Sequence, residues 1–221
     1  MLVQPVKPAV AAAFQDVLVP IMSVGEDEAA LRAADEVCQI SGGRAVAMLA
    51  SPLPSAMYAG DPFGGVEMWS SVIATLHADA KKEAAKVKER LAKASSPMEF
   101  RTTEMEYFLS REAVLMSARH ADATILLRPS KEEDRNFRYD LIESVLFESG
   151  RPVLIVPPTQ KKPIAFNNVV VAWNASRESA RAVGDAAGII DGAEKVTIVT
   201  INAEPSSMGV GQAPGADIAA H

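Results

Sequence analysis

Cysteine is almost absent from this sequence. The 221 residues include a single one, Cys38, so no internal disulfide can form. Disulfide frameworks belong to oxidising compartments, and we therefore expect a cytoplasmic protein. The simplest interpretation of Cys38 is a small core residue. No His or Cys residues stand at the spacing of metal ligands, so we also expect no metal site.

Long hydrophobic runs and an excess of positive charge are missing as well. No apolar run approaches the roughly 20 residues that a membrane-spanning helix needs, so we expect no contact with a membrane. The net charge is −6 and the sequence pI is about 5.2. This acidic balance argues against a nucleic-acid binder, whose binding face would be basic. The hydrophobic content of 48% is enough to build a full core.

Short apolar runs alternate with helical patterns through the first two-thirds of the chain. This alternation predicts a doubly wound α/β domain with a five-stranded parallel sheet that helices cover on both faces. The expected strands are 16–21, 44–50, 98–106, 124–127 and 152–156, and the expected helices are 28–40, 67–94, 110–120 and 139–149.

The opening pattern then recurs. Residues 166–171 (FNNVVV) echo 14–19 (FQDVLV), and 180–200 echo 30–50 at a separation two residues shorter. The change in separation predicts two extra residues in the first strand-to-helix loop. A repeat of this length indicates two copies of one domain, the second a strand-helix-strand fragment. Such a fragment either packs on the first domain, pairs with another chain or stays partly disordered.

The repeat and the linker between its copies define the expected organisation of the chain. The predicted parts are a flexible arm over 1–14, a first domain over 15–157, a linker over 158–166, a partial second domain over 167–201 and a tail over 202–221.

Four stretches carry a family resemblance. They are VLVPI at 17–21, HADATILL at 120–127, SGRPVLIVP at 149–157 and VVVAWNASRESARAV at 169–183. In this order they resemble a tandem universal stress protein with a truncated second domain. The resemblance implies the strand order 3-2-1-4-5 and a role in the response to stress.

Glycine is missing where that family uses it to bind ATP. Nucleotide-binding members carry glycines after the fourth strand, because only glycine lets backbone amides approach phosphates so closely. The matching positions here are Leu127, Ser130 and a third within 139–141, and the whole range 66–149 has no glycine. The resemblance therefore implies that the first domain does not bind ATP through the family motif, and we expect no cofactor.

The adenine side of the site is degenerate too. Met22 stands where the family has an adenine-contacting aspartate, and Asp140 would place a carboxylate near the phosphates. In the second copy Asn174, followed by Ser176, leaves half a site. The alternative is an adenine-nucleotide or other small-ligand module with a non-standard crevice. That crevice would comprise Met22, Ser23, Leu49, Arg128 and Ser130.

Charged residues fill the loop after the fourth strand. An anion site and a solvated, salt-bridging loop are both conceivable, and we favour the solvated loop because charge runs are usually solvated. The residues that could bind an anion are Arg128, Ser130, Lys131, Arg135 and Arg138, and the acidic residues among them are Glu132, Glu133, Asp134 and Asp140.

No catalytic constellation stands out. His120 lies near Ser117 and Asp122, but all three come from one helix end and no strained nucleophile turn occurs. We interpret them as structural residues and expect no enzyme.

The last strand of the first domain is the segment that we expect to matter for assembly. It comprises Pro152, Val153, Leu154, Ile155 and Val156. It resembles the edge strand through which domains of the family pair, and an edge strand offers free N–H and C=O groups. The expected function is a stress-response protein that acts by forming a homodimer through this strand and by binding a protein partner of unknown identity.

Overall fold

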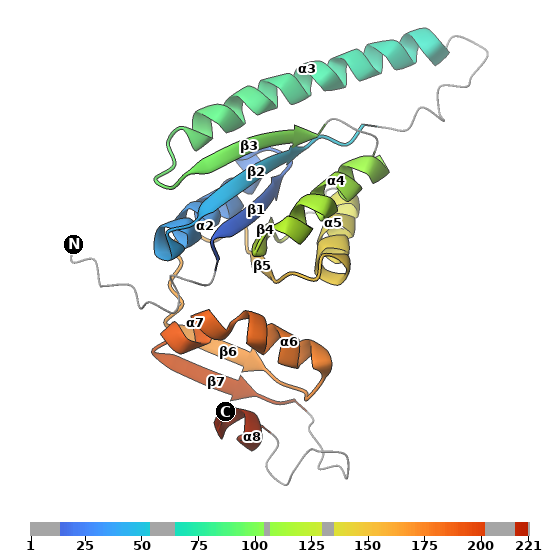
Figure 1. Cartoon of the computed structure of the whole chain (residues 1–221). Helices are drawn as coiled ribbons and strands as arrows, with labels where there is room; N and C mark the ends of the chain where they lie inside the picture. The colour runs from blue at the N-terminus through green and yellow to red at the C-terminus, as the bar shows by residue number, and fades with distance from the viewer. Residues whose placement is uncertain (1–13, 54–64, 104–106, 130–134, 202–214, 221) are drawn as a thin grey trace. The chain divides into compact units, whose positions relative to one another are not determined.

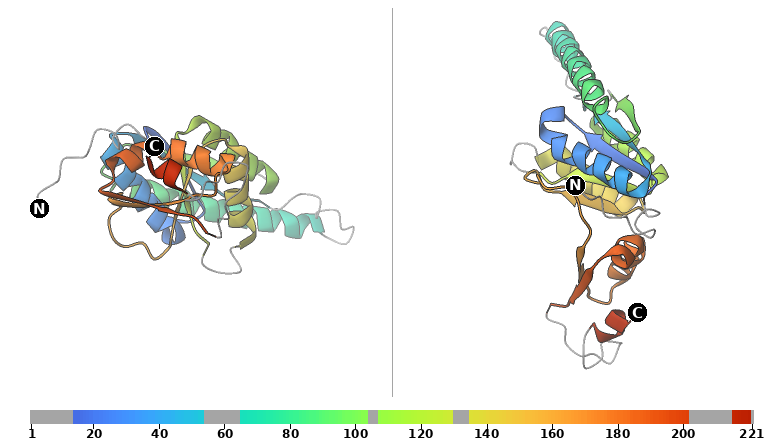
Figure 2. Two further views of the ribbon diagram at one scale, coloured as in Figure 1. Left: turned by 90° about the horizontal axis from the view of Figure 1, so that it is seen from below. Right: turned by 90° about the vertical axis from the view of Figure 1, so that its left-hand side faces the viewer.

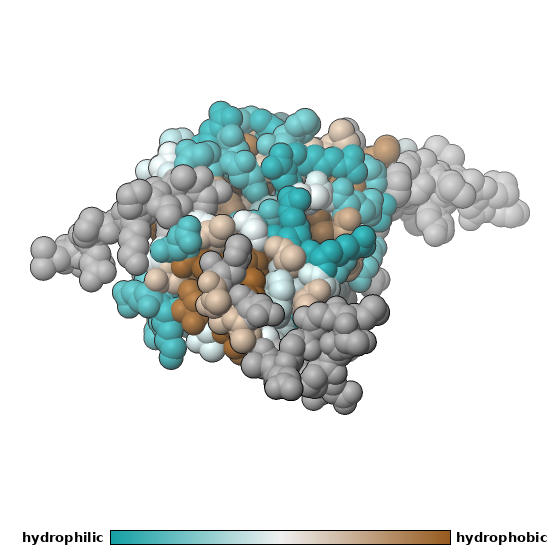
Figure 3. Space-filling model, turned by 60° about the horizontal axis from the view of Figure 1, so that its bottom comes forward, coloured by the Kyte–Doolittle hydropathy of each residue, from teal (hydrophilic) through white to brown (hydrophobic). Residues whose placement is uncertain are grey.

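The computed structural model describes residues 14–53, 65–103, 107–129, 135–201 and 215–220 (Figure 1). They belong to two compact units, Phe14–Pro163 and Ile164–His221. On the face drawn in Figure 3, many of the coloured side chains are hydrophilic and the strongly apolar ones gather in a smaller patch.

The first unit alternates strands and helices in the predicted order. Its elements are β1 (Asp16–Ile21), α2 (Val24–Ser41), β2 (Arg44–Ala50), α3 (Gly65–Leu91), β3 (Met98–Thr103), α4 (Tyr107–His120), β4 (Ala123–Leu127), α5 (Arg135–Glu148) and β5 (Val153–Val156). All neighbouring strands are parallel, and their order is β3-β2-β1-β4-β5. The predicted doubly wound fold and strand order are therefore confirmed.

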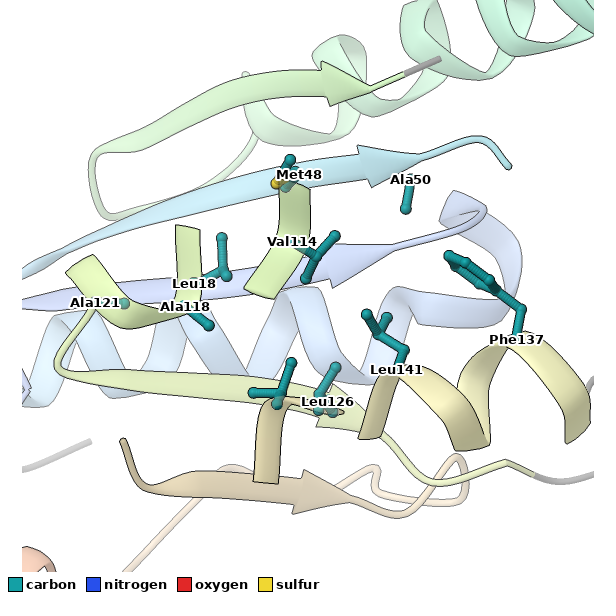
Figure 4. Close-up of a cluster of buried hydrophobic side chains, with 10 residues drawn as sticks. Leu18, Met48, Ala50, Val114, Ala118, Ala121, Leu126, Phe137 and Leu141 are labelled. Atoms are coloured by element: carbon teal, nitrogen blue, oxygen red, sulfur yellow. The ribbon is translucent and has the colours of Figure 1, made fainter. Parts of the chain in front are cut away.

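Helices cover both faces of this sheet, which explains why its central strands are apolar on both sides. On one face, α4 and α5 pack Val114, Phe137 and Leu141 against Leu18 and other strand residues (Figure 4). On the other face lies α2, with α3 beside it.

Cys38 belongs to the apolar side of α2. It is 1% exposed, and burial together with the nearby carboxylates of Asp35 and Asp16 raises the pKa of its thiol to about 11. A thiol with that pKa is protonated at neutral pH and is a poor nucleophile. The interpretation of Cys38 as a core residue agrees with this burial.

Two element boundaries differ from the predicted ones in ways that affect the site. Helix α5 begins at Arg135 rather than at 139, so Arg138 lies in a helix and not in a charged loop. The connection from β1 to α2 is only Met22 and Ser23. The predicted longer loop in the first copy is therefore wrong, because its extra residues extend α2 by about a turn.

The second unit is a strand-helix-strand fragment, as predicted. It contains β6 (Asn168–Ala172), α6 (Arg177–Asp185), α7 (Ala187–Gly192), β7 (Lys195–Val199) and α8 (Ala216–Ala220). Its two strands are parallel. Neither α6 nor α7 has a buried residue. Among the described residues of both units, no helix combines the length and apolarity needed to cross a membrane.

Candidate functional site

The carboxyl ends of β1 and β4 form the point in the sheet where the strand order reverses. Strand β1 pairs with β2 on one side and with β4 on the other. In open α/β sheets, ligands bind in the crevice outside the carboxyl ends of the strands at this point. The residues that follow β1 and β4 therefore define the candidate site.

Asp27 closes the turn that follows β1. The additional turn of α2 places its carboxylate under the start of the helix, where it is 0% exposed. Its Oδ2 accepts hydrogen bonds from the backbone N–H groups of Met22 at 2.7 Å and Ser23 at 3.1 Å. Ser23 is the N-cap of α2, and its hydroxyl accepts a bond from the N–H of Glu26. The backbone donors after β1 are thus used within the chain.

Arg138 enters the same place from α5. Its Nη1 donates to Asp27 Oδ1 at 2.5 Å, and its Nη2 donates to Asp27 Oδ2 at 3.2 Å and to Glu26 Oε2 at 2.8 Å. The residue is only 6% exposed. The prediction of a solvated loop is therefore wrong for Arg138, because the earlier start of α5 turns its side chain into a buried partner of α2.

The electrostatics of this pair keep both helices together. Burial lowers the pKa of Arg138, but the hydrogen bonds and charges of Asp27 and Glu26 raise it by more, and the net shift is upward. The guanidinium therefore remains charged. Its fork meets the carboxylate of Asp27 at both oxygens, the geometry in which Arg binds carboxylates most strongly.

A second carboxylate balances the partial positive charge at the N-terminus of α2. Glu83 of α3 accepts the N–H of Val24 at 2.6 Å. Burial raises the pKa of Glu83, while the bonds from Lys86 and Val24 lower it by more, so the net shift is downward. A helix N-terminus normally attracts anions. Here the chain supplies the negative charge itself.

The described residues of the predicted crevice do not form a phosphate cradle. Leu49 is 0% exposed and Leu127 is 6% exposed, so both belong to the core. Met22 packs partly buried against the cluster between the sheet and the α4–α5 layer. Arg128 is exposed, and its N–H donates to the carbonyl of Val156.

Asp140 is the remaining predicted residue that the structure describes, and as a carboxylate it adds no phosphate donor. Asp140 is exposed on α5. Ser130 and residues 131–134 of the charged loop lie outside the described residues. The N–H groups of Met22 and Ser23 are bound to Asp27, and the sequence has no glycine between β4 and the end of α5. The described residues therefore do not offer phosphates the close approach to backbone N–H groups that the family resemblance implies.

The pairing of Asp27 with Arg138 was not predicted from the sequence. The two residues are 111 positions apart, and no local pattern links them. The signal available in the sequence was Asp27 itself, four residues after the serine that caps the helix, a spacing at which a carboxylate reaches the first turn.

Asn174 and Ser176, the predicted half-site of the second unit, form hydrogen bonds with backbone groups close to them in the chain. The Oδ1 of Asn174 accepts the N–H of Ser176 at 3.1 Å, and Ala175 between them has a φ of 59°. The hydroxyl of Ser176 caps α6 by accepting the N–H of Ser179. Such a turn is a common way to begin a helix.

Two of the three residues considered for a catalytic triad, Ser117 and Asp122, have main-chain partners. Ser117 donates to the carbonyl of Ala113, and Asp122 Oδ2 accepts the N–H groups of Gln15 and Asp16, both at 2.9 Å. Asp122 therefore fixes the start of β1. Among the described residues, no group of three or more His, Cys, Asp or Glu side chains is placed to hold a metal ion.

Strand β5 lies at the edge of the sheet. The carbonyls of Pro152 and Val156 accept bonds from the N–H groups of Thr124 and Arg128. In a parallel ladder alternate residues face the neighbouring strand. The main-chain groups of Val153 and Ile155 therefore face away from β4, and Ile155 is 43% exposed.

The strand order and the two helical layers define a doubly wound α/β protein with a five-stranded parallel sheet. A universal stress protein from Archaeoglobus fulgidus DSM 4304 has a similar structure, with a TM-score of 0.61 and 12% identity over 90% of this chain and 70% of that one. The first unit therefore has the universal stress protein fold, as the sequence predicted.

A second solved structure is similar over a smaller part of this chain. It is the hypothetical protein MJ0577, described as a test case for assigning biochemical function from structure. Its TM-score is 0.50 and its identity 15%, over 68% of this chain and 99% of that one. No family model and no curated protein matches the sequence.

Proposed function

We propose that this chain is a stress-response protein of the universal stress protein type, which acts by self-association and by contact with a protein partner. Neither enzymatic activity nor ATP binding through the family motif is part of this proposal. The observation that carries it is the free edge of β5, where the outward main-chain groups of Val153 and Ile155 meet no strand of the described sheet. A short apolar edge of this kind pairs readily with a second strand.

The pairing that we propose is antiparallel, between the β5 strands of two copies. The outward N–H and C=O groups of Val153 and Ile155 would then bond to the same groups of the partner strand. Because Ile155 is also 43% exposed, its side chain loses water contact on association, which favours the dimer.

Proline at position 155 is expected to abolish this dimer. Ile155→Pro removes an N–H that faces away from β4, and an edge strand tolerates proline at such a position. Light scattering at micromolar concentration should show the mass of a dimer for the wild type and half that mass for the variant. The matched Ile155→Val variant keeps the N–H and should remain dimeric.

Circular dichroism should show that Ile155→Pro keeps the secondary structure of the wild type. A wild-type protein that scatters as a monomer would refute the proposed assembly, as would a folded Ile155→Pro variant that stays dimeric.

Calorimetric titration with ATP and Mg²⁺ is expected to give only heats of dilution. The reason is that Asp27 already binds the N–H groups of Met22 and Ser23, while Arg138 fills the adjoining space from α5. A phosphate would have to displace a buried, doubly hydrogen-bonded ion pair. Saturable binding in the micromolar range would contradict this part of the proposal.

A further inference from the structure

One face of the two-stranded sheet in the second unit carries no helix among the described residues. Figure 2 shows the helices of this unit on one side of its two strands. Gly215, at the start of α8, lies against the side chains of Ile198 and Thr200, which mark the covered side. Alternation along β7 places Thr197 and Val199 on the other side, and Val170 shares this side because it is paired with Thr197. Val170 and Val199 are 68% and 38% exposed, and we call this side the bare face.

The first unit shows what normally lies on such a face. There α2 connects β1 to β2 and covers one side, while the opposite side is covered by α4 and α5. In the second unit, α6 and α7 make the equivalent connection from β6 to β7. By this comparison, the bare face corresponds to the face of the first sheet that a layer of helices covers.

The outer side of α5 offers an apolar helix face. Tyr139, Leu146 and Phe147 are 41%, 49% and 79% exposed. Their spacing of seven and eight residues places them along one side of the helix, and we call this side the α5 stripe. An exposed run of large apolar side chains of this kind marks an interaction site.

The two surfaces match in length and in charge. Five strand residues span roughly 17 Å, and the 14 residues of α5 span roughly 21 Å. Glu143 is exposed within the α5 stripe, and Lys195 is exposed on the bare face. Contact between the surfaces would bring opposite charges together, which fixes the register of an interface more than it adds affinity.

The proposed antiparallel pairing of β5 decides which α5 is within easy reach. With Val153 of one strand opposite Ile155 of the other, it places Val156 at the end of one β5 beside Pro152, just before the start of the other β5. Helix α5 ends at Glu148, only a few residues before Val153. The chain that leaves β5 toward the second unit therefore emerges beside the end of α5 of the other copy, which carries Leu146 and Phe147. In its own α5, Leu146 and Phe147 lie at the far end of the strand.

We propose that the bare face of one chain packs on the α5 stripe of a second copy of this chain. The inference rests on the proposed dimer through β5. The contact covers the bare face with apolar side chains, which the described residues of the second unit do not do. In a symmetric dimer each copy makes this contact with the other, so the arrangement is reciprocal.

Cysteine cross-linking tests this contact directly. In a Cys38→Ala background, chains with Phe147→Cys are coexpressed with chains with Val170→Cys and oxidised mildly. A disulfide between chains, with twice the chain mass on a non-reducing gel, is the expected result. The control replaces Val170→Cys by Arg177→Cys on α6, which lies on the covered side and should give several-fold less cross-linked product.

Charge reversal provides a second measurement. Lys195→Glu should lower the cross-linked fraction several-fold at low salt, and Glu143→Lys on the other chain should restore it.

The outcomes separate this inference from the proposed dimer. A dimeric mass without the disulfide between chains overturns the inference and leaves the β5 dimer standing. A further variant carries both Phe147→Cys and Val170→Cys in the same chain. If its disulfide forms only within one chain, the helix on the bare face is α5 of the same chain, and the inference fails. A monomeric wild type overturns both proposals.

Discussion

Replacing Arg138 by methionine is expected to lower the free energy of unfolding of the first unit by about 3–5 kcal/mol. The substitution keeps an apolar stem of similar length but removes the guanidinium that binds Asp27 at both oxygens. Asp27 is 0% exposed, so its charge would remain buried with only the N–H groups of Met22 and Ser23 as partners. Urea unfolding followed by circular dichroism measures this loss.

The double variant Asp27→Asn, Arg138→Met separates the charge effect from the packing effect. It leaves no buried charge, and the amide oxygen of asparagine still accepts a backbone N–H. We expect it to recover at least half of the loss, since a buried ion pair is often replaced by neutral groups at little cost.

An exposed ion pair of the second unit serves as the control for Arg138→Met. Arg177 is paired with Glu178, and their side chains are 94% and 67% exposed. Solvent screens such a pair, so Arg177→Met should leave the unfolding midpoint unchanged. If Arg138→Met costs no more than Arg177→Met, the ion pair does not hold α5 to α2.

Replacing Asp35 by alanine is expected to cost about 2 kcal/mol, the effect of leaving backbone donors without an acceptor. Asp35 lies on α2, and its carboxylate accepts the N–H groups of Ser95 at 3.1 Å and Ser96 at 2.8 Å. These bonds fix the turn between α3 and β3. Urea unfolding of the wild type and the variant at neutral pH gives the difference.

The pH dependence of this difference identifies the carboxylate as its source. Burial raises the pKa of Asp35, but the bonds from Ser95 and Ser96 lower it by more, so it lies below its ordinary value of 3.8. A group with a lowered pKa in the folded state stabilises above its unfolded pKa and loses this effect as pH falls through the folded pKa. The advantage of the wild type should thus be full above a pH of about 4 and shrink below it.

The internal repeat supplies a control for Asp35→Ala. In the aligned copies Asp185 matches Asp35, but its carboxylate binds only Arg181 within the same exposed helix among the partners described. Asp185→Ala should therefore change stability little and without the acid dependence. Equal losses in the two variants would show that the turn after α3 does not depend on Asp35.

The pattern of the sequence was by itself sufficient for the order of the elements and for a parallel sheet, whereas the strand order came from the family resemblance. Strands such as β1, β2 and β4 are nearly continuous apolar runs because both faces of a parallel sheet are covered, and this pattern is local. The short apolar strand at the end of the first unit also proved to lie at the sheet edge. Each of these features depends on residues that are neighbours in the chain.

Only the tertiary structure decided the character of the crevice. The start of α5 carries Arg135 and Arg138, whose charge suggested a solvated loop, whereas packing of Phe137 and Leu141 on the sheet draws this segment into a helix. The buried partner of Arg138 is Asp27, 111 residues away.

A long-range ion pair has no local signature, because its free energy depends on burial and geometry that exist only after the sheet has formed. The sequence therefore determined the frame of a doubly wound α/β fold and the absence of glycine from 66 to 149. The tertiary structure determined that Asp27 and Arg138 occupy its centre.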